Sequence, residues 1–444
     1  MPTARPVWTS DEGTMAQETA KSRWPKIVSG IIDDLEVEID ALRICLPQRA
    51  EGRAIVHHLH TLREEIKSDA ALRPFEPATN PGITGYNKQL AEGGDFSWRK
   101  SPWLFAECYL YRYVQEIFSR SQHWQGYDVF KRKKDSTLIK SQNAVKQTAD
   151  WLTRMVMDAV KPIKELDTEA ARLLFIEATA LALWGNATDL SLLTNLSLED
   201  IQKLQGQKNI EESQRNIVAN DTDLVWQYLQ SGKPSNGDCR IDIILDNAGF
   251  ELYTDLLYAS YLLESGLTTS VVLHAKCFPW FVSDATPEDM ESLLRHLESN
   301  NAFSDHEHLD RLTASFRQYV KLGILEVKTH PFWTTAHSFH KLPEYAPELL
   351  ENLRQSHLTI WKGDLNYRKL TDDGLWPHTT QFKTALGNIG KGSGVKVLSL
   401  RTNKSDTCVG VKTEARVKEL DKEAPGKAWV RSGSYAVVSF SDGE

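Results

Sequence analysis

Apolar side chains recur every three or four residues through the first half of the chain, which is the spacing that places them on one face of an α-helix. This pattern predicts helices around residues 27–42, 55–66, 101–118, 142–160 and 167–184. A proline- and glycine-rich stretch at 74–94 is predicted to be a loop. The polar stretch 203–221 is predicted to be a surface connection.

The pattern changes near residue 236, where short β-branched and apolar runs replace the helical spacing. Six runs predict strands: IDIIL (241–245), VVLH (271–274), ILEVK (324–328), LTIW (358–361), VKVLSL (395–400) and YAVVSF (435–440). Helical patterns at 250–265 and 286–299 lie between some of them. This alternation indicates an α/β fold with a mostly parallel sheet and helices on both faces.

The chain is long enough for more than one domain. Its 444 residues suggest about two to three domains. We predict a flexible N-terminus at 1–20, a mainly helical region at 21–235 and an α/β catalytic domain at 236–444. Hydrophobic residues make up 41% and charged residues 25%, which is close to the globular average and excludes a globally disordered chain.

Charge and cysteine content narrow the expected partners. The 52 basic and 60 acidic residues give a net charge of −8, which argues against a nucleic-acid or anionic-membrane binder. Five scattered cysteines without a Cys-x-x-Cys pair argue against a disulfide framework or a structural zinc site. We see neither a secretory signal nor an apolar stretch of ~18 residues that would span a membrane. We therefore expect a cytosolic protein that can also reach the nucleus by diffusion.

Polar residues follow several of the predicted strands. Asp246 and Asn247 follow the first strand, and Asp284 comes after the second. In a parallel sheet these strand ends meet at one edge, where ligands bind. Carboxylate and amide oxygens are ligands that Mg²⁺ and Mn²⁺ prefer, and three of them leave positions for water and a substrate phosphate. Alternatively, Asp246 only caps the following helix, a position that Asp and Asn often take.

Basic residues follow the later strands, at Lys362, Arg368, Arg401 and Lys404. On the same edge of the sheet they would balance the charge of a phosphate. Each one alone could equally be a solvated surface residue. It is the mixture of charges at converging strand ends that favours a site.

Other patterns are weaker. His57 and His60 would share one side of a helix, which we interpret as a solvated face. The stretch His306-Glu307-His308 lacks the spacing of a zinc-protease helix. The glycine-rich residues 387–394 lack the phosphate-loop spacing and precede a strand, so we predict a loop.

Several segments together resemble the metal-dependent damage-control phosphatases. They are SPWLFAECYLYR (101–112), WGNATDLSL (184–192), LDNAGFELYTDLL (245–257), PWFVSD (279–284), FWT (332–334), KGDLNYRKL (362–370) and RTNK (401–404). The similarity is closest to the subfamily marked by an Arg-Thr-x-Lys motif. It implies a three-layer α/β/α domain beside a helical region, and a phosphorylated small molecule as substrate. The implied activity is hydrolysis of sugar phosphates, such as fructose 1-phosphate and fructose 6-phosphate, with Mn²⁺, Ni²⁺ or Co²⁺; Mg²⁺ is a further candidate.

The resemblance also assigns roles to residues. The implied metal ligands are Asp246, Asn247 and Asp284. The implied substrate-binding residues are Asp246, Asn247, Asp364, Leu365, Asn366, Tyr367, Arg368 and Lys404. Asp246 and Asp364 are the candidate catalytic residues, and either could direct the nucleophile or protonate the leaving alcohol. The sequence leaves open whether water attacks directly or an aspartyl-phosphate forms.

Two other functions stay open. One is S-adenosylmethionine-dependent methyl transfer to protein glutamate, an activity also attributed within the resembling subfamily. It predicts a glycine-rich turn after the first strand, where this chain has Asp-Asn-Ala-Gly at 246–249. The other is a non-catalytic interaction protein that binds metal at a degenerate site.

Overall fold

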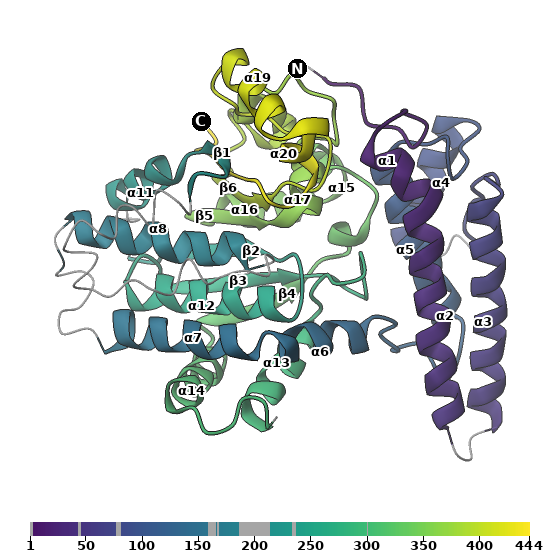
Figure 1. Ribbon diagram of the computed structural model, residues 1–444, viewed down its shortest axis with the longest axis horizontal. Coiled ribbons are helices and arrows are strands. Elements are labelled where there is room, and N and C mark those ends of the chain that lie inside the picture. The colour runs from purple at the N-terminus through teal and green to yellow at the C-terminus, as the bar shows by residue number, and fades with distance from the viewer. Residues whose placement is uncertain are drawn as a thin grey trace.

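The computed structural model describes residues 3–42, 46–76, 81–158, 166, 168–185, 214–232, 237–299 and 301–444, with a seven-stranded sheet at its centre (Figure 1). The strands are β1 (Ile217–Asn220), β2 (Arg240–Ile244), β3 (Ser270–Ala275), β4 (Leu325–Thr329), β5 (Leu358–Lys362), β6 (Val397–Thr402) and β7 (Ala436–Ser441). Strands β2 to β7 confirm the six predicted ones. The prediction of a connection at 203–221 is wrong where β1 forms, because an edge strand of four residues with one buried side chain shows too little alternation.

The strand order is β1-β7-β6-β5-β2-β3-β4. Neighbouring strands are parallel except for the antiparallel pair β6 and β7, which confirms a mostly parallel sheet. Strands β6, β5, β2 and β3 lie next to one another in the same direction. Their carboxyl ends therefore share one edge, and these are the four strand ends at which the sequence places polar and charged residues.

Helices cover both faces of the sheet, so the α/β domain has three layers (Figure 1). Helices α7 and α8 flank α12 on one face. The helices of this layer are α7 (Gln142–Leu152), α8 (Thr168–Trp184), α11 (Thr222–Ser231), α12 (Phe250–Glu264), α13 (Pro287–Ser299) and α14 (Glu307–Leu322). The opposite layer contains α15 (Leu342–Tyr345), α16 (Pro347–Arg354), α17 (Gly363–Leu370), α18 (Phe382–Ala385), α19 (Glu414–Glu423) and α20 (Ala428–Arg431).

Alternate side chains of the central strand β2 point to opposite faces of the sheet and pack into the two cores. Ile241 and Ile243 belong to the core under α8 and α12, whereas Ile244 belongs to the core under α15 to α20. All three are fully buried, as expected for a parallel strand covered on both faces. The one acidic residue of β2, Asp242, lies 2.8 Å from Arg240 Nε and 3.0 Å from His274 of β3, so its buried carboxylate has partners.

A helical unit stands beside the α/β domain, at the right of Figure 1. Its helices are α1 (Met15–Glu18), α2 (Trp24–Ala41), α3 (Leu46–Lys67), α4 (Pro81–Gly93) and α5 (Trp103–Ser119), and α6 (Lys131–Lys140) leads from it to the α/β domain. The core of the unit also includes Trp280, Val282 and Leu365, which belong to loops and helix α17 at the carboxyl edge of the sheet. The unit therefore packs directly against the edge where the site is expected.

Helix α4 corrects the prediction of a loop at 74–94. Its glycines lower helix propensity, which is why the sequence indicates a loop. However, Ile83, Tyr86 and Leu90 recur at helical spacing and are at most 7% exposed, so they pack into the core of the helical unit. Burial of this apolar face outweighs the weak local propensity.

The N-terminal segment also packs against the rest of the chain. Val7, Ala16 and Ala20 are buried in the core of the helical unit, and the Val7 N–H donates to the Asp373 carbonyl at 3.0 Å. Helices α7, α8 and α11, which belong to the predicted helical region, pack against the sheet instead of the helical unit. The domain boundaries stay a prediction.

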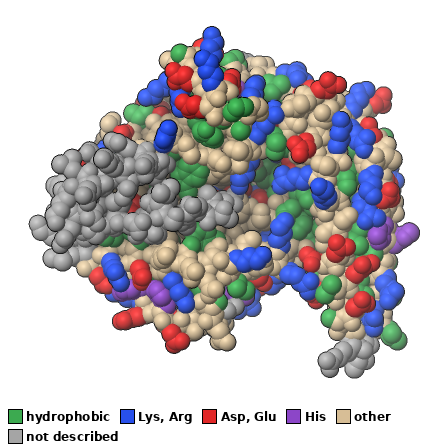
Figure 2. Space-filling view, in the orientation of Figure 1, with side chains coloured by type: hydrophobic (Ala, Val, Ile, Leu, Met, Phe, Trp, Pro, Cys, Tyr) green, Lys and Arg blue, Asp and Glu red, His purple; other side chains and the backbone are tan. Residues whose placement is uncertain are grey.

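The visible surface carries both signs of charge. On the face shown in Figure 2, Lys and Arg side chains are interspersed with Asp and Glu. Among the residues that the structure describes, no helix combines the length and apolar character needed to cross a membrane.

Glu177 in α8 provides a test of the core. Burial raises its pKa to about 8 from the ordinary value of 4.5, and the Trp151 indole lowers it only in part. Between these two values unfolding releases a proton, so stability is lost as the pH rises. Glu177→Gln is expected to raise the free energy of unfolding at pH 7 by roughly 3 kcal/mol and to change it little at pH 4. Urea unfolding at both pH values measures this, and an equal gain at both would contradict it.

Candidate active site

Backbone hydrogen bonds tie the segment after β2 to the segment after β3. The Ala285 N–H donates to the Asp246 carbonyl and the Ala248 N–H donates to the Ser283 carbonyl, both at 2.7 Å. Asn247 and Asp284 form an isolated antiparallel bridge between the same segments. The structure thus brings together the three predicted metal ligands.

Asp246 faces this cluster and not the start of the following helix. The N-cap of α12 is Gly249, and no side chain caps that helix, so the alternative that Asp246 is a helix cap is wrong. The carboxylate is 6% exposed, and its Oδ2 accepts from Asn247 Nδ2 at 2.7 Å. Gly363 lies directly against it, with a φ of +81°, and a Cβ there would be 2.0 Å from Asp246 Oδ2. Only glycine fits at this approach of β5 to β2.

Asn247 joins the cluster on both sides of its amide. Its Nδ2 also donates to Glu251 Oε2 at 2.7 Å, and its Oδ1 accepts from the Ser283 hydroxyl. As a metal ligand Asn247 would offer Oδ1. The Ser283 hydroxyl and the Glu251 carboxylate therefore hold the amide in place beside Asp246.

Asp284 is presented by a strained turn. Phe281 and Val282 have φ values of 46° and 69°, the left-handed region that costs such side chains about 1–3 kcal/mol each. Both side chains pack against the core of the helical unit, which stabilises the turn. The Asp284 carboxylate is 2% exposed, and its Oδ2 forms an ion pair with Lys276 Nζ at 3.0 Å. Because a carboxylate has about four lone-pair sites, this ion pair leaves acceptor capacity for a ligand.

Buried acids dominate the charge at this point. Burial raises the pKa of Asp246 well above its usual value, the carboxylates of Glu251 and Asp284 raise it further, and the ammonium groups of Lys276 and Lys404 oppose the rise. Burial also raises the pKa of Asp284, against the effect of Lys276. A cation bound among these oxygens would relieve the repulsion between them.

The donor atoms fit a hard divalent ion. Two carboxylates and one amide oxygen are the ligand types that Mg²⁺ and Mn²⁺ take. Across the described ranges, no group of three or more His, Cys, Asp and Glu side chains is placed to hold a metal ion. Asn247 Oδ1 would therefore be an essential third protein ligand beside Asp246 and Asp284.

Asp364 anchors the loop that carries Lys404. Its Oδ1 accepts from Arg401 Nε at 2.7 Å, from the Lys404 N–H at 3.0 Å and from the Ser405 hydroxyl at 3.1 Å. Burial favours the neutral acid, but the guanidinium groups of Arg401 and Arg368 and these hydrogen bonds hold the pKa of Asp364 below its usual value. An ionised carboxylate is an acceptor only, which argues against Asp364 as the proton donor to a leaving alcohol.

The two basic residues of the Arg-Thr-Asn-Lys segment differ in role. Arg401 is fully buried, donates to the Thr407 carbonyl at 2.7 Å and to the Ser405 hydroxyl at 2.8 Å, and shapes the loop 401–407. Lys404 is half-buried, and its ammonium makes no hydrogen bond or ion pair with the described residues. Because its charge acts on Asp246, Lys404 is the cation of this segment that is placed to meet a ligand.

Arg368 is already occupied. Its Nε and Nη2 donate to the two oxygens of Asp373 at 2.9 Å, and its Nη1 donates to Glu107 Oε2 at 2.8 Å. The guanidinium also lies 3.7 Å from the centre of the Trp103 ring. Two carboxylates balance its one positive charge, which argues against the predicted role of Arg368 on the phosphoryl oxygens.

The other three residues of the predicted substrate segment support α17 from within. Leu365 packs in the core of the helical unit. Asn366 Nδ2 donates to the Lys362 carbonyl at 2.7 Å, and the Tyr367 hydroxyl accepts from the Val409 N–H at 3.0 Å. Their side chains position the helix, and no side chain caps its first turn, so backbone N–H groups remain there for an anion.

Three charged residues of the site either were not predicted from the sequence or were predicted to have another role. Lys276 follows β3 directly, and Glu251 comes four residues after Asn247 on the first turn of a predicted helix, a spacing that could have indicated their contact. Lys362, predicted as a cation at the edge, is 1% exposed and pairs with Asp255 and Glu251. It neutralises buried acids and is not available to a ligand.

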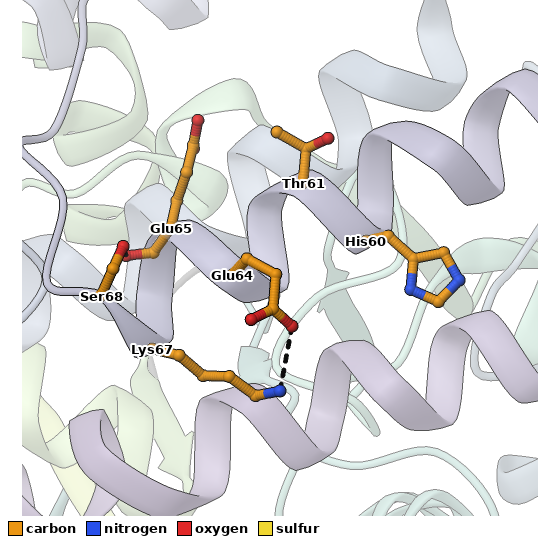
Figure 3. A pocket seen from close by; sticks show the side chains of 6 residues that line it. All are labelled: His60, Thr61, Glu64, Glu65, Lys67 and Ser68. Atoms are coloured by element: carbon orange, nitrogen blue, oxygen red, sulfur yellow. Dashed lines mark hydrogen bonds and ion pairs between the residues drawn. The ribbon is translucent and has the colours of Figure 1, made fainter.

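An open surface groove lies away from this site. It has a volume of about 670 Å³, runs along α3, and is lined by His60, Thr61, Glu64, Glu65, Lys67 and Ser68 (Figure 3). Lys67 and Glu64 pair across it at 3.0 Å, and the lining residues come from one helix surface. His57 is exposed on the same helix, in agreement with a solvated face. We assign no chemistry to this groove.

An oxygen-rich acidic cluster beside a lysine, at the carboxyl edge of an α/β sheet, is the kind of site that metal-dependent phosphatases use. The family model described as the damage-control phosphatase ARMT1-like domain matches residues 19–420. The chain belongs to this family and is a phosphatase with a damage-control, metabolite-repair role.

The relatives support the assignment over nearly the whole chain. The damage-control phosphatase ARMT1 of Danio rerio is 34% identical over 443 residues, covering 97% of this chain and 95% of its own length. Those of Mus musculus and Homo sapiens are 33% and 31% identical, and each comparison covers 97% of both chains.

Among solved structures, a DUF89 family protein from Pyrococcus horikoshii is 14% identical with a TM-score of 0.40, covering 94% of this chain and 98% of that chain.

Proposed function

We propose that this phosphatase requires a divalent metal ion and hydrolyses sugar phosphates such as fructose 1-phosphate and fructose 6-phosphate. The proposed cofactor is Mn²⁺, with Ni²⁺, Co²⁺ and Mg²⁺ as alternatives. The observation that supports this best is the convergence of Asp246, Asn247 and Asp284, where burial and two close carboxylates raise the pKa of Asp246.

Different residues around the cluster would bind the substrate phosphate and hold its binding loop in place. Lys404 would bind the substrate phosphate, because its charge acts on Asp246 and its ammonium makes no hydrogen bond or ion pair with the described residues. The backbone N–H groups at the start of α17 would donate hydrogen bonds to the same phosphate, since an uncapped helix N-terminus favours an anion. Asp364 holds the Lys404 loop in place through three hydrogen bonds.

The chemistry then requires a polarised phosphorus and an oriented nucleophile. A bound divalent ion supplies charge to the phosphoryl oxygens and lowers the pKa of a bound water. Asp246 and Asp284 would hold that ion, and Asp246 would also direct the nucleophile. Burial of the cluster strengthens these electrostatic interactions because little water screens them.

Metal removal gives the direct test. Purified protein with Mn²⁺ is expected to release inorganic phosphate from fructose 1-phosphate, and EDTA is expected to abolish this release because the three ligands then hold no ion. A panel with Ni²⁺, Co²⁺ and Mg²⁺ identifies the preferred metal. The control is EDTA followed by excess Mn²⁺, which should restore the rate. Equal rates with and without EDTA would overturn the metal requirement.

A further inference from the structure

The turn before Asp284 holds two side chains in a conformation that they rarely adopt. Phe281 and Val282 have φ values of 46° and 69°. A bulky or β-branched residue in this left-handed region is strained, and such strain persists only where the surrounding structure enforces it. The Asp284 N–H donates to the Trp280 carbonyl at 3.0 Å, and the Ser283 N–H donates to the Phe281 carbonyl at 2.9 Å. The geometry of the turn therefore sets the position of Asp284.

Helix α5 of the helical unit supplies contacts that enforce this turn. The Tyr111 ring stacks on Phe281, with 4.7 Å between ring centres and 28° between ring planes. Tyr111 also contacts the Trp280 ring at 5.9 Å, and the neighbouring Arg112 guanidinium lies 5.4 Å from the centre of the Phe278 ring. Tyr111 and Trp280 are at most 2% exposed. The turn therefore packs into the core of the helical unit, although it follows a strand of the sheet.

This packing bears directly on metal binding. Divalent ions such as Mg²⁺ and Ca²⁺ take oxygen ligands within a narrow range of about 2.0–2.6 Å, so a small shift of a carboxylate weakens its bond to the ion. If the turn relaxed to an unstrained conformation, the Asp284 carboxylate would move relative to Asp246 and Asn247. Groups that orient a metal ligand typically change metal affinity about ten- to a hundredfold when they are removed.

We infer that Tyr111 and Phe281 form a positioning pair, through which the helical unit holds the strained turn and so places Asp284 for metal binding. The inference rests on the proposed function, because it takes Asp284 as a ligand of a divalent ion. It makes the helical unit a part of the metal site, although none of the proposed ligands belongs to that unit. Metal binding and the packing of the turn on α5 then stabilise each other, since coupling between two sites is reciprocal.

Mn²⁺ calorimetry on two variants of Tyr111 tests the stack. Tyr111→Leu keeps an apolar side chain but removes the ring, and is expected to weaken Mn²⁺ affinity about tenfold. Tyr111→Phe removes only the hydroxyl and keeps the ring, so its affinity should stay within about twofold of the wild-type value. Unchanged affinity in Tyr111→Leu, or an equal loss in both variants, would overturn the positioning pair and leave the proposed function intact.

The matched control is Tyr109→Leu. Tyr109 lies on the same helix, is 1% exposed and packs against Phe75 within the helical unit, with 4.8 Å between ring centres. Its replacement should destabilise the unit without changing Mn²⁺ affinity, because Tyr109 does not stack on the turn. A similar loss of affinity in Tyr109→Leu and Tyr111→Leu would mean that any damage to the unit disturbs the metal, which contradicts a specific role of Tyr111.

A glycine in the turn separates the effect of strain from that of general packing. Val282→Gly adopts the left-handed φ without strain, so the turn no longer depends on the helical unit to stay in that conformation. The loss of Mn²⁺ affinity caused by Tyr111→Leu should therefore shrink to about threefold or less in the Val282→Gly background. Each loss is measured within one background, so an effect of Val282→Gly by itself cancels. The inference fails if Tyr111→Leu costs the same factor in both backgrounds.

Hydrogen exchange of the wild-type protein gives a second measurement, which decides even if Tyr111→Leu does not fold. Added Mn²⁺ is expected to slow exchange in residues 278–285 and also along α5, because metal binding stabilises the stack in return. Protection of 278–285 without any change in α5 would overturn the inference but not the metal site. If calorimetry of the wild-type protein finds no binding of Mn²⁺, Ni²⁺, Co²⁺ or Mg²⁺, the proposed metal requirement fails and the inference fails with it.

Discussion

Asp246→Ala is expected to lower kcat/KM for phosphate release by about two to three orders of magnitude while the chain stays folded. The carboxylate would be one of two charged ligands of the metal ion, and it lies at the end of β2 beside Glu251 and Asp284. Its removal therefore costs the site its metal but relieves repulsion between buried acids. Phosphate release from fructose 1-phosphate, Mn²⁺ calorimetry and urea unfolding measure the three quantities.

The matched control is Asp223→Ala. Asp223 is 58% exposed on α11 and pairs with Arg172 on the surface, so its loss should change neither turnover nor metal affinity. Near-normal turnover together with unchanged Mn²⁺ affinity in Asp246→Ala would refute the assignment of Asp246.

The sequence predicts the strands and the shared edge well because both depend on local pattern. Each central strand is a short apolar run, since a parallel strand covered on both faces has no exposed residues to interrupt it. Directly after these runs stand Asp246, Asn247 and Gly363, and parallel pairing alone brings strand ends to one edge. This is why Asp246 and Asn247 could be placed before the fold was known.

The sequence pattern could not predict which charged side chains form ion pairs in the folded protein. Arg368 and Glu107 are 261 positions apart, and nothing near either residue indicates that they pair. The same holds for Lys362 and Asp255, which are 107 positions apart. Sequence patterns identify which residues are charged, but tertiary packing decides which charges are neutralised and which stay available.

Helix α4 and strand β1 illustrate the same limit for structure. The apolar residues of α4 follow helical spacing but stand among glycines, so the local signal favours a loop while the core of the helical unit favours a helix. Strand β1 exists because it completes the edge of the sheet beside β7, a partner more than 200 residues later.

The methyl-transfer alternative stays a prediction, and calorimetry with S-adenosylmethionine tests it: no binding at millimolar concentration would exclude it.

The second large effect is expected at Lys404. Lys404→Ala should impair the use of fructose 1-phosphate by about ten- to a hundred-and-fifty-fold, because a charge-assisted hydrogen bond contributes about 1.5–3 kcal/mol. Mn²⁺ affinity should not weaken, since Lys404 is no ligand and its positive charge opposes a cation. Steady-state kinetics and Mn²⁺ calorimetry on the same preparation measure both. Lys418→Ala, an exposed lysine on α19, is the matched control and should change neither.

The kinetic form of the loss carries further information. A rise in KM alone would mean that Lys404 binds the phosphate equally in the ground state and the transition state, whereas a fall in kcat would mean that the contact strengthens as charge develops on the phosphoryl oxygens. Arg401 cannot substitute for it, because its guanidinium is fully buried and bonded to Asp364, Thr407 and Ser405. Lys404→Arg should keep more activity than Lys404→Ala, because arginine keeps the positive charge at this half-buried position. If Lys404→Ala turned over fructose 1-phosphate at the wild-type rate, this lysine would be an ordinary surface charge and the phosphate would have to be held by α17 and the metal ion alone.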